Sequence, residues 1–251
     1  MSTPSAGYWA VIPAAGSGRR MASAVPKQYL TMHGRSVLEW SLQPFLDDVR
    51  CHAVIVAIAV DDEHWSRLNL RHHKLHVVFG GAERADSVLA GLNALLDDQA
   101  PRTRRQAAMN DWVLVHDAAR PCLHRDDLDS LLAAARDGET VGALLATPLA
   151  DTLKQANADQ RVAQTLSRAD LWRALTPQMF RLGELRTALQ HAAAQRVVVT
   201  DESSAMEAMG QYARLVAGRS DNLKITMPED LLLAESILAA RAVGITRRET
   251  T

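Results

Sequence analysis

The sequence predicts an α/β domain in which helices cover both faces of a mostly parallel, twisted sheet. Short apolar runs rich in β-branched residues alternate along the chain with longer amphipathic segments of helical period. The run 53–60 is almost entirely apolar, which is typical of a strand that is buried on both faces. Because parallel strands need crossover connections, this alternation indicates a sheet with helices on both sides. We expect the 251 residues to form one such domain.

The expected strands are short and are flanked by turn residues. They are 9–13, 53–60, 75–79, 112–116, 142–146 and 196–200. The expected helices carry apolar residues three and four positions apart. They are 38–45, 86–96, 125–136, 182–195 and 202–210. A last helix is expected after Thr226, with Pro228 in its first turn and Glu229 placed as in a capping box, and it runs to about Ala242.

Two segments interrupt the alternation of strands and helices. Residues 97–111 are polar and lack periodicity, which predicts a surface loop. Residues 147–176 predict two short strands around a polar turn at 157–160, forming a β-hairpin arm that projects from the main sheet. Because an exposed arm of this kind can pack against a second copy of the chain, we expect a homodimer formed through it.

Composition narrows the classes of partner. The 28 basic and 29 acidic side chains nearly cancel, so no overall field favours nucleic acid or a membrane surface, and we expect neither as a partner. No stretch approaches the roughly 18 apolar residues of a membrane-spanning helix, and the residues before the first strand lack the pattern of a signal peptide. Cys51 and Cys122 lack zinc-site spacing and are expected to be buried thiols. These features predict a cytoplasmic protein.

The first strand is followed by a glycine loop, here residues 11–21, with the sequence V-I-P-A-A-G-S-G-R-R-M. The segment A-S-A-V-P-K-Q-Y-L follows and brings Lys27. Small residues allow backbone N–H groups to approach an anion closely, while arginine and lysine supply positive charge. The combination predicts a binding site for a nucleoside triphosphate, and the alternative is a tight turn with solvated arginines.

Two common nucleotide loops are excluded by single residues. A Walker A loop ends in Gly-Lys-Ser/Thr, whereas Gly18 is followed by Arg19. A dinucleotide-binding loop needs a third glycine, and Met21 stands in its place. The glycine loop therefore belongs to another type of nucleotide site.

Further motifs follow the glycine loop in a fixed order. They are G-G-A-E-R-A-D-S-V at 80–88, V-H-D-A-A-R-P at 115–121, D-T-L-K at 151–154, L-T-P-Q at 175–178, T-D-E at 200–202 and D-N-L-K-I-T at 221–226. With these motifs and P-K-Q-Y-L, over about residues 9–238, the chain resembles the 2-C-methyl-D-erythritol 4-phosphate cytidylyltransferases. The resemblance implies a Rossmann-like nucleotidyltransferase fold. It also implies a reaction of CTP with methylerythritol phosphate, in the non-mevalonate isoprenoid pathway, that gives 4-diphosphocytidyl-2-C-methyl-D-erythritol and pyrophosphate.

The resemblance also implies roles for individual residues. Those implied to be catalytic are Arg20, Lys27, Arg168 and Lys224. Those implied to bind the nucleotide are Ala14, Ala15, Gly16, Gly18, Gly81, Ala82, Ser87 and Ala118. Those implied to bind the acceptor are Asp117, Arg120, Thr176 and Thr200. The implied cofactor is Mg²⁺, held mainly through the phosphates of CTP, with Asp117 as an alternative ligand.

Several alternatives stay open at this level. The acceptor could be a pentitol phosphate such as ribitol 5-phosphate, or the chain could bind nucleotide without catalysis. Asp117 and Arg120 could form a plain salt bridge, and His116 is expected to be a packing residue at a strand end. If the arm is exchanged between subunits, Arg168 could act in the neighbouring site. The chain ends soon after the last expected helix, so we expect no fused second catalytic domain.

Overall fold

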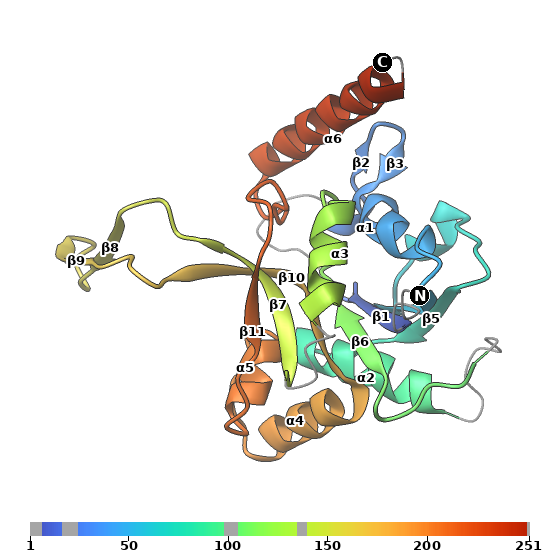
Figure 1. Cartoon of the computed structure of the whole chain (residues 1–251), viewed down its shortest axis with the longest axis horizontal. Helices are drawn as coiled ribbons and strands as arrows, with labels where there is room; N and C mark the ends of the chain where they lie inside the picture. Colours follow the sequence, from blue (N-terminus) through green and yellow to red (C-terminus); the bar gives the residue numbers. More distant parts are fainter. Residues whose placement is uncertain (1–6, 17–24, 98–104, 135–139, 250–251) are drawn as a thin grey trace.

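The computed structural model describes residues 7–16, 25–97, 105–134 and 140–249. Its centre is a seven-stranded sheet with the strand order β11-β7-β10-β6-β1-β4-β5 (Figure 1). In chain order the strands are β1 Tyr8–Pro13, β4 Cys51–Ile58, β5 Leu75–Phe79, β6 Trp112–Val115, β7 Gly142–Pro148, β10 Trp172–Arg181 and β11 Arg214–Ala217. Strand β10 runs antiparallel to both β6 and β7, whereas the other pairings are parallel. The predicted mostly parallel sheet is confirmed.

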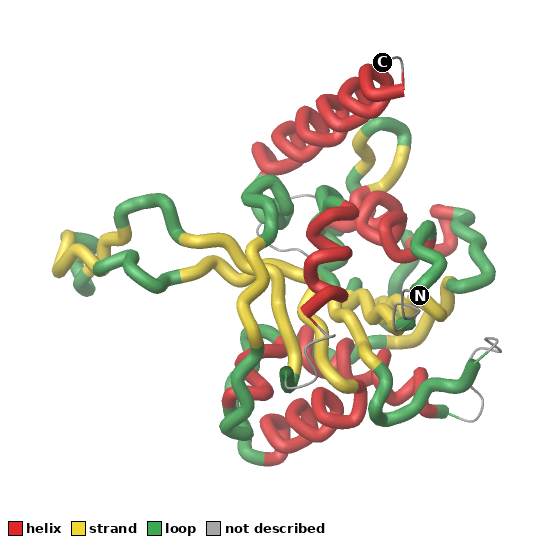
Figure 2. Tube along the Cα trace, viewed as in Figure 1, coloured by secondary structure: helices red, strands yellow, loops and turns green. Residues whose placement is uncertain are grey.

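Helices cover both faces of the sheet because successive strand residues point to opposite sides. In β1, Tyr8 and Ile12 pack on one face with α1 (Val37–Leu46) and α3 (Arg125–Ala134). Trp9 and Val11 pack on the other face with α2, α4 and α5. These last helices span Arg84–Leu96, Leu182–Ala194 and Glu202–Glu207 (Figure 2). The predicted helical layers are confirmed.

A third apolar cluster joins the C-terminal helix to the start of the chain. Helix α6 (Pro228–Glu249) buries Ala234 beside Met32, Cys122 and Ile225. The small hairpin β2 (Thr31–Met32) and β3 (Arg35–Ser36) lies here. Two short 3-10 helices, η2 (Lys27–Tyr29) and η3 (Trp65–Leu68), lie in connections elsewhere in the first 70 residues. Both cysteines are buried and unpaired, as expected. None of the described helices has the length and apolar character needed to cross a membrane.

The beginning and the end of α6 differ from expectation. The carboxylate of Asp230, rather than Glu229, accepts from the backbone N–H groups of Thr226 and Met227, at 2.7 and 2.8 Å. The Thr226 hydroxyl instead donates to the carbonyl of Lys224 at 3.2 Å. The expected capping box is therefore wrong. The free N–H groups at the start of the helix are bound by Asp230, four residues after Thr226, and not by Glu229. The helix also continues to Glu249, past the expected end at Ala242.

The expected strand at 196–200 is wrong. These residues form an irregular connection between α4 and α5, in which Val198 is 84% exposed. Three valines followed by Thr200 gave the strand pattern, but none of the described strands pairs with them. The sheet instead uses β10, which carries Pro177 and a register shift between Ala174 and Gln178, and the short edge strand β11.

The predicted hairpin is present as strands β8 (Leu153–Ala156) and β9 (Val162–Leu166), which pair antiparallel. The turn between them is closed by Asn157, whose side-chain oxygen accepts from the N–H groups of Asp159 and Arg161. Figure 1 shows this arm extending from β7 and β10, well away from the sheet. The expected surface loop at 97–111 lies partly outside the described residues, and its described parts, 97 and 105–111, contain no helix or strand.

Candidate active site

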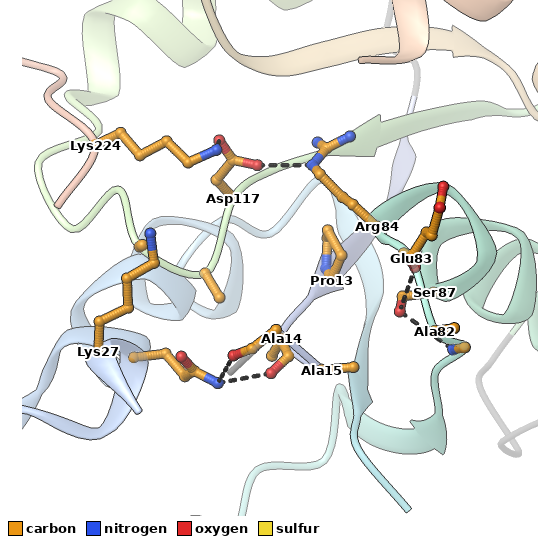
Figure 3. A pocket seen from close by; sticks show the side chains of 15 residues that line it. Pro13, Ala14, Ala15, Lys27, Ala82, Glu83, Arg84, Ser87, Asp117 and Lys224 are labelled. Carbon is orange, nitrogen blue, oxygen red and sulfur yellow. Dashed lines mark hydrogen bonds and ion pairs between the residues drawn. The ribbon is translucent and has the colours of Figure 1, made fainter. Parts of the chain in front are cut away.

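A cleft lies at the carboxyl ends of β1 and β6, the edge at which open α/β sheets bind ligands (Figure 3). It is walled by the glycine loop, the start of α2, the end of β6 and the segment before α6. Its lining residues are Pro13, Ala14, Ala15, Gly16, Lys27, Gln28, Gly81, Ala82, Glu83, Arg84, Ser87, Asp117, Ala118, Ala119 and Lys224. Segments more than 200 residues apart in the sequence therefore meet in one site.

One wall of the cleft is built from small residues. The expected nucleotide residues that line it are Ala14, Ala15, Gly16, Gly81, Ala82, Ser87 and Ala118. The Ser87 hydroxyl is buried, accepts from the N–H of Gly81 at 3.2 Å and donates to the carbonyl of Glu83 at 3.2 Å. Ser87 thus fixes the turn that leads into α2. Gly18 lies outside the described residues.

The close approach of Asp86 leaves no room for a side chain at Gly81. A Cβ added there would stand 2.3 Å from the Cβ of Asp86, so the turn would have to shift. We expect Gly81→Ala to raise the KM for the nucleotide by about 10-fold or more, since misplacement of a binding wall weakens alignment. Gly218→Ala is the control, because its added Cβ would meet atoms only at 3.4 Å or beyond, outside the cleft. Equal nucleotide KM values in the two variants would contradict this role of Gly81.

Gln28 holds the described start of the glycine loop by hydrogen bonds, although the sequence motifs did not single it out. Its amide nitrogen donates to the carbonyls of Ala14 at 2.8 Å and Gly16 at 3.1 Å. The side chain is buried, so these bonds hold the loop without competition from water. The neighbouring Lys27 points into the cleft (Figure 3). Its ammonium group donates to the carbonyl of Ile225 at 2.8 Å.

Asp117 is a buried carboxylate at the end of β6 that contacts three cations. Its oxygens lie 3.0 Å from Arg84 Nε, 3.0 Å from Lys224 Nζ and 3.3 Å from Arg120 Nε. Burial alone would raise the pKa of Asp117, but Arg84, Lys224 and Arg120 outweigh it and hold the pKa well below its usual range. Asp117 is therefore ionised, and it holds Lys224 at the mouth of the cleft.

The structure places Arg120 and Thr176 behind Asp117 rather than in the cleft wall. Arg120 is buried, pairs with Asp117 and donates to the carbonyl of Asn222 at 2.7 Å, so the salt bridge considered as an alternative is present. The Thr176 hydroxyl accepts from the N–H of Asp117 at 3.1 Å and lies 2.9 Å from His116 Nδ1. Both residues position Asp117 in this structure.

His116 is fully buried, as a packing residue would be. Its Nε2 lies 3.0 Å from the carbonyl of Arg120, which suits an Nε2–H donor. Burial lowers the pKa of His116 to about 4. The imidazole is therefore neutral near pH 7 and links the end of β6 to β10 without carrying charge.

Arg84 is a member of the site that the motifs did not single out. It begins α2 and joins Asp117 to Glu202 of α5, to which it donates from Nη1 at 2.6 Å and from Nη2 at 3.1 Å. The sequence did carry one signal for Arg84 as a site residue, namely a charged side chain at a helix start close to two glycines. Its partner Glu202 lies 118 positions away and could not be paired with it from spacing alone.

Two further expected residues, Thr200 and Arg168, are not brought into the cleft. Thr200 is exposed, and its N–H donates to the Ser204 hydroxyl at 3.0 Å just before α5. Arg168 is exposed on the arm, which leads away from the cleft of its own chain (Figure 1). Arg20 lies outside the described residues. Within the described ranges, no group of three or more His, Cys, Asp or Glu residues is arranged to hold a metal ion.

The sequence is similar to that of proteins of one known family. A model of the family "2-C-methyl-D-erythritol 4-phosphate cytidylyltransferase" matches residues 8–240. The relative of that name from Ectopseudomonas mendocina is 55% identical over 225 residues, covering 89% of this chain and 92% of the relative. The relative from Pseudomonas entomophila is 53% identical over 232 residues, covering 92% of this chain and 95% of the relative.

Solved structures share the fold. A crystal structure of 4-diphosphocytidyl-2C-methyl-D-erythritol synthase superposes with a TM-score of 0.78 at 33% identity, covering 93% of this chain and 99% of that one. The Francisella tularensis 2-C-methyl-D-erythritol 4-phosphate cytidylyltransferase gives a TM-score of 0.77 at 33% identity, covering 92% of this chain and all of that one. With the family model matching most of its length, the chain belongs to the 2-C-methyl-D-erythritol 4-phosphate cytidylyltransferase (IspD) family.

Proposed function

We propose that the cleft aligns CTP with 2-C-methyl-D-erythritol 4-phosphate for cytidylyl transfer, the activity of the family. An oxygen of the acceptor's 4-phosphate attacks the α-phosphorus of CTP, a new P–O bond forms, and the bond to the β-phosphate breaks to release pyrophosphate. The observation that carries the proposal is the convergence of Lys27 and Lys224 on a cleft walled by small residues (Figure 3). Such a step needs alignment and positive charge more than covalent chemistry.

The nucleotide half of the cleft suits a ligand that needs close backbone contact. Gly81, Ala82 and Ser87 present little bulk at the start of α2, and the cytosine ring is proposed to lie against them. The triphosphate is proposed to lie along Ala14, Ala15 and Gly16, with Lys27, Arg20 and the N–H groups of the glycine loop around it.

The acceptor half is centred on Asp117 and Lys224. We place a hydroxyl of the acceptor near Asp117, which lines the cleft, and its phosphate near Lys224. Because Arg120 and Thr176 lie behind Asp117, they are proposed to act through it in the arrangement seen here. Thr200 would join them only if the acceptor reaches the start of α5.

Mg²⁺ is proposed to be bound mainly by phosphate oxygens of CTP, whose charge it would neutralise. Asp117 does not fit as its ligand in this structure, because one carboxylate oxygen faces Arg84 and the other faces Lys224 and Arg120. The proposed location is the cytoplasm, where the unpaired thiols of Cys51 and Cys122 would stay reduced.

An acceptor assay tests the proposed function. We expect purified protein with CTP and Mg²⁺ to release pyrophosphate with methylerythritol 4-phosphate, at a kcat/KM at least about 100-fold above that with ribitol 5-phosphate. A preference for ribitol 5-phosphate would overturn the acceptor assignment. Tight binding of CTP without turnover of either acceptor would overturn catalysis.

The arm is proposed to form a homodimer and to place Arg168 in the site of the partner. Its apolar side chains Val162, Leu166, Leu171 and Trp172 are exposed to between 37% and 64%, and a second subunit could cover them. Sedimentation velocity is expected to give a dimer mass, and dilution below the dimer's dissociation constant should lower specific activity.

Complementation between two inactive variants tests the exchange directly. Mixed and re-equilibrated Arg168→Ala and Lys27→Ala proteins should regain about one quarter of wild-type activity, because half of the dimers are mixed and each holds one intact site. Activity no higher than the sum of the separate variants would show that Arg168 does not act across the dimer.

A further inference from the structure

Two buried carboxylates from different layers of the fold are joined by a single guanidinium group. Asp117 ends β6, Glu202 begins α5, and Arg84 of α2 lies between them. The side chain of Glu202 is 1% exposed and that of Asp117 is 8% exposed, while Arg84 retains 27%. Charges this deeply buried are stable only when they are paired in good geometry.

The contacts use the whole guanidinium group. Nη1 and Nη2 of Arg84 form a bidentate salt bridge with the two carboxylate oxygens of Glu202, at 2.6 and 3.1 Å. Nε donates to Oδ1 of Asp117 at 3.0 Å. Each of the three guanidinium nitrogens of Arg84 thus donates to a protein carboxylate, although the residue lines the cleft.

Arg84 adds orientation to Asp117 as well as charge. Oδ2 of Asp117 already faces Lys224 at 3.0 Å and Arg120 at 3.3 Å, whereas Oδ1 faces Arg84. With one oxygen held on each side, the plane of the carboxylate cannot rotate freely. The ammonium group of Lys224 is therefore held at a defined point of the cleft (Figure 3).

Glu202 is itself fixed from the sheet. Gln178 of β10 donates to the carboxylate of Asp201 at 2.8 Å and accepts from the N–H of Ser203 at 2.9 Å. The residues on both sides of Glu202 are thereby anchored to a buried strand residue. Glu202 can transmit this rigidity to Arg84, whose own side chain has many rotamers.

We infer that Arg84, held by Glu202, is a positioning residue that fixes Asp117 and Lys224 for the acceptor. The inference rests on the proposed function, since it specifies how that site is held. The competing possibility is that Arg84 binds CTP directly. In that case Glu202 would only neutralise it, and the two residues would affect different kinetic constants.

Kinetics of Glu202→Gln and Arg84→Lys separate these possibilities. Each variant should lower kcat/KM for the acceptor by about 10- to 100-fold, because a displaced Asp117 misaligns the acceptor. The KM for CTP should stay within about 3-fold of wild type in both. The double variant should be little worse than either single variant, because both changes break the same pair. Glu202→Asp, which keeps the charge, should show a smaller loss in the same direction.

Glu207→Gln is the matched control on the same helix. Glu207 is exposed and accepts from the Ser203 hydroxyl at 2.7 Å, away from Arg84. Its variant should retain wild-type constants, and a thermal melt of every variant with and without CTP reports folding and nucleotide binding independently of turnover.

Two results would overturn the inference. One is a large rise in the KM for CTP, or loss of the CTP-induced rise in Tm, in Arg84→Lys but not in Glu202→Gln. The other is wild-type acceptor kinetics in both variants. A wild-type protein that turns over no acceptor would instead refute the proposed function, so the two failures are distinguishable.

Discussion

Replacing Lys27 by alanine is expected to lower kcat/KM by about 100- to 1,000-fold, or about 3–4 kcal/mol of transition-state stabilisation. The ammonium group lines the cleft and is tied to the carbonyl of Ile225 at 2.8 Å, so its charge is held on a fixed support. Negative charge builds on the phosphates as the bond to pyrophosphate breaks. A cation already in place stabilises that charge without reorganisation.

Steady-state kinetics with CTP as the varied substrate measures this effect. Lys74→Ala is the control, since Lys74 likewise donates to backbone carbonyls, those of Leu46 and Asp48, but lies outside the cleft. It should lose stability and keep kcat/KM. If Lys27→Ala kept kcat/KM within a few-fold of wild type, Lys27 would have no part in the transition state.

Replacing Asp117 by asparagine is expected to cost about 3–5 kcal/mol of stability, the usual cost of removing one partner from a buried ion pair. The amide keeps the shape of the carboxylate but leaves Arg84, Arg120 and Lys224 without their shared counter-charge. Activity should fall as well, because Lys224 loses the partner that holds it at the cleft. Urea unfolding and acceptor kinetics measure the two losses separately.

The pH dependence of unfolding is a second measure of how much the Asp117 carboxylate contributes to stability. The pKa of this group is depressed in the folded protein, so its contribution to stability is complete above the unfolded value of about 4. That contribution is lost as the pH falls from about 4 towards the folded pKa. The difference in unfolding free energy between wild type and Asp117→Asn should therefore shrink in acid.

Asp126→Asn is the control for the pH series, because the Asp126 side chain is 83% exposed and its carboxylate lies 3.5 Å from Nδ1 of His124. It should track wild type across the range. A wild-type to Asp117→Asn difference that stays constant down to pH 3, or that grows in acid, would contradict the depressed pKa.

Much of the sheet could be predicted because its strands follow simple patterns. The apolar run 53–60 became β4, and the run 75–79 became β5. Strand β10 was missed because Pro177 interrupts its pattern, and pairing with β6 and β7 decides its structure. Strand β11 is four residues long and mostly exposed, so its sequence shows no alternation of apolar and polar residues that would predict it.

The sequence predicted the parts of the candidate site where small residues let a ligand approach the backbone. It predicted less well the parts where long side chains from distant segments meet. Small residues such as Ala14, Gly81 and Ala118 line the cleft as expected. Gln28 and Arg84 were not singled out, because their roles depend on reaching carbonyls and carboxylates that other segments supply. Arg120 was expected to meet the acceptor, yet it is buried behind Asp117, a depth that spacing along the chain does not encode.

Phosphorus NMR of a single reaction mixture tests the central claim, transfer of the cytidylyl group to the acceptor phosphate. With CTP, methylerythritol 4-phosphate and Mg²⁺, the three CTP signals should give way to pyrophosphate and to the coupled pair of a new diphosphate diester, in equal amounts. The Lys27→Ala protein at the same concentration should leave CTP almost unchanged over that time. Formation of CMP with pyrophosphate, or persistence of CTP with the wild-type protein, would contradict the claim.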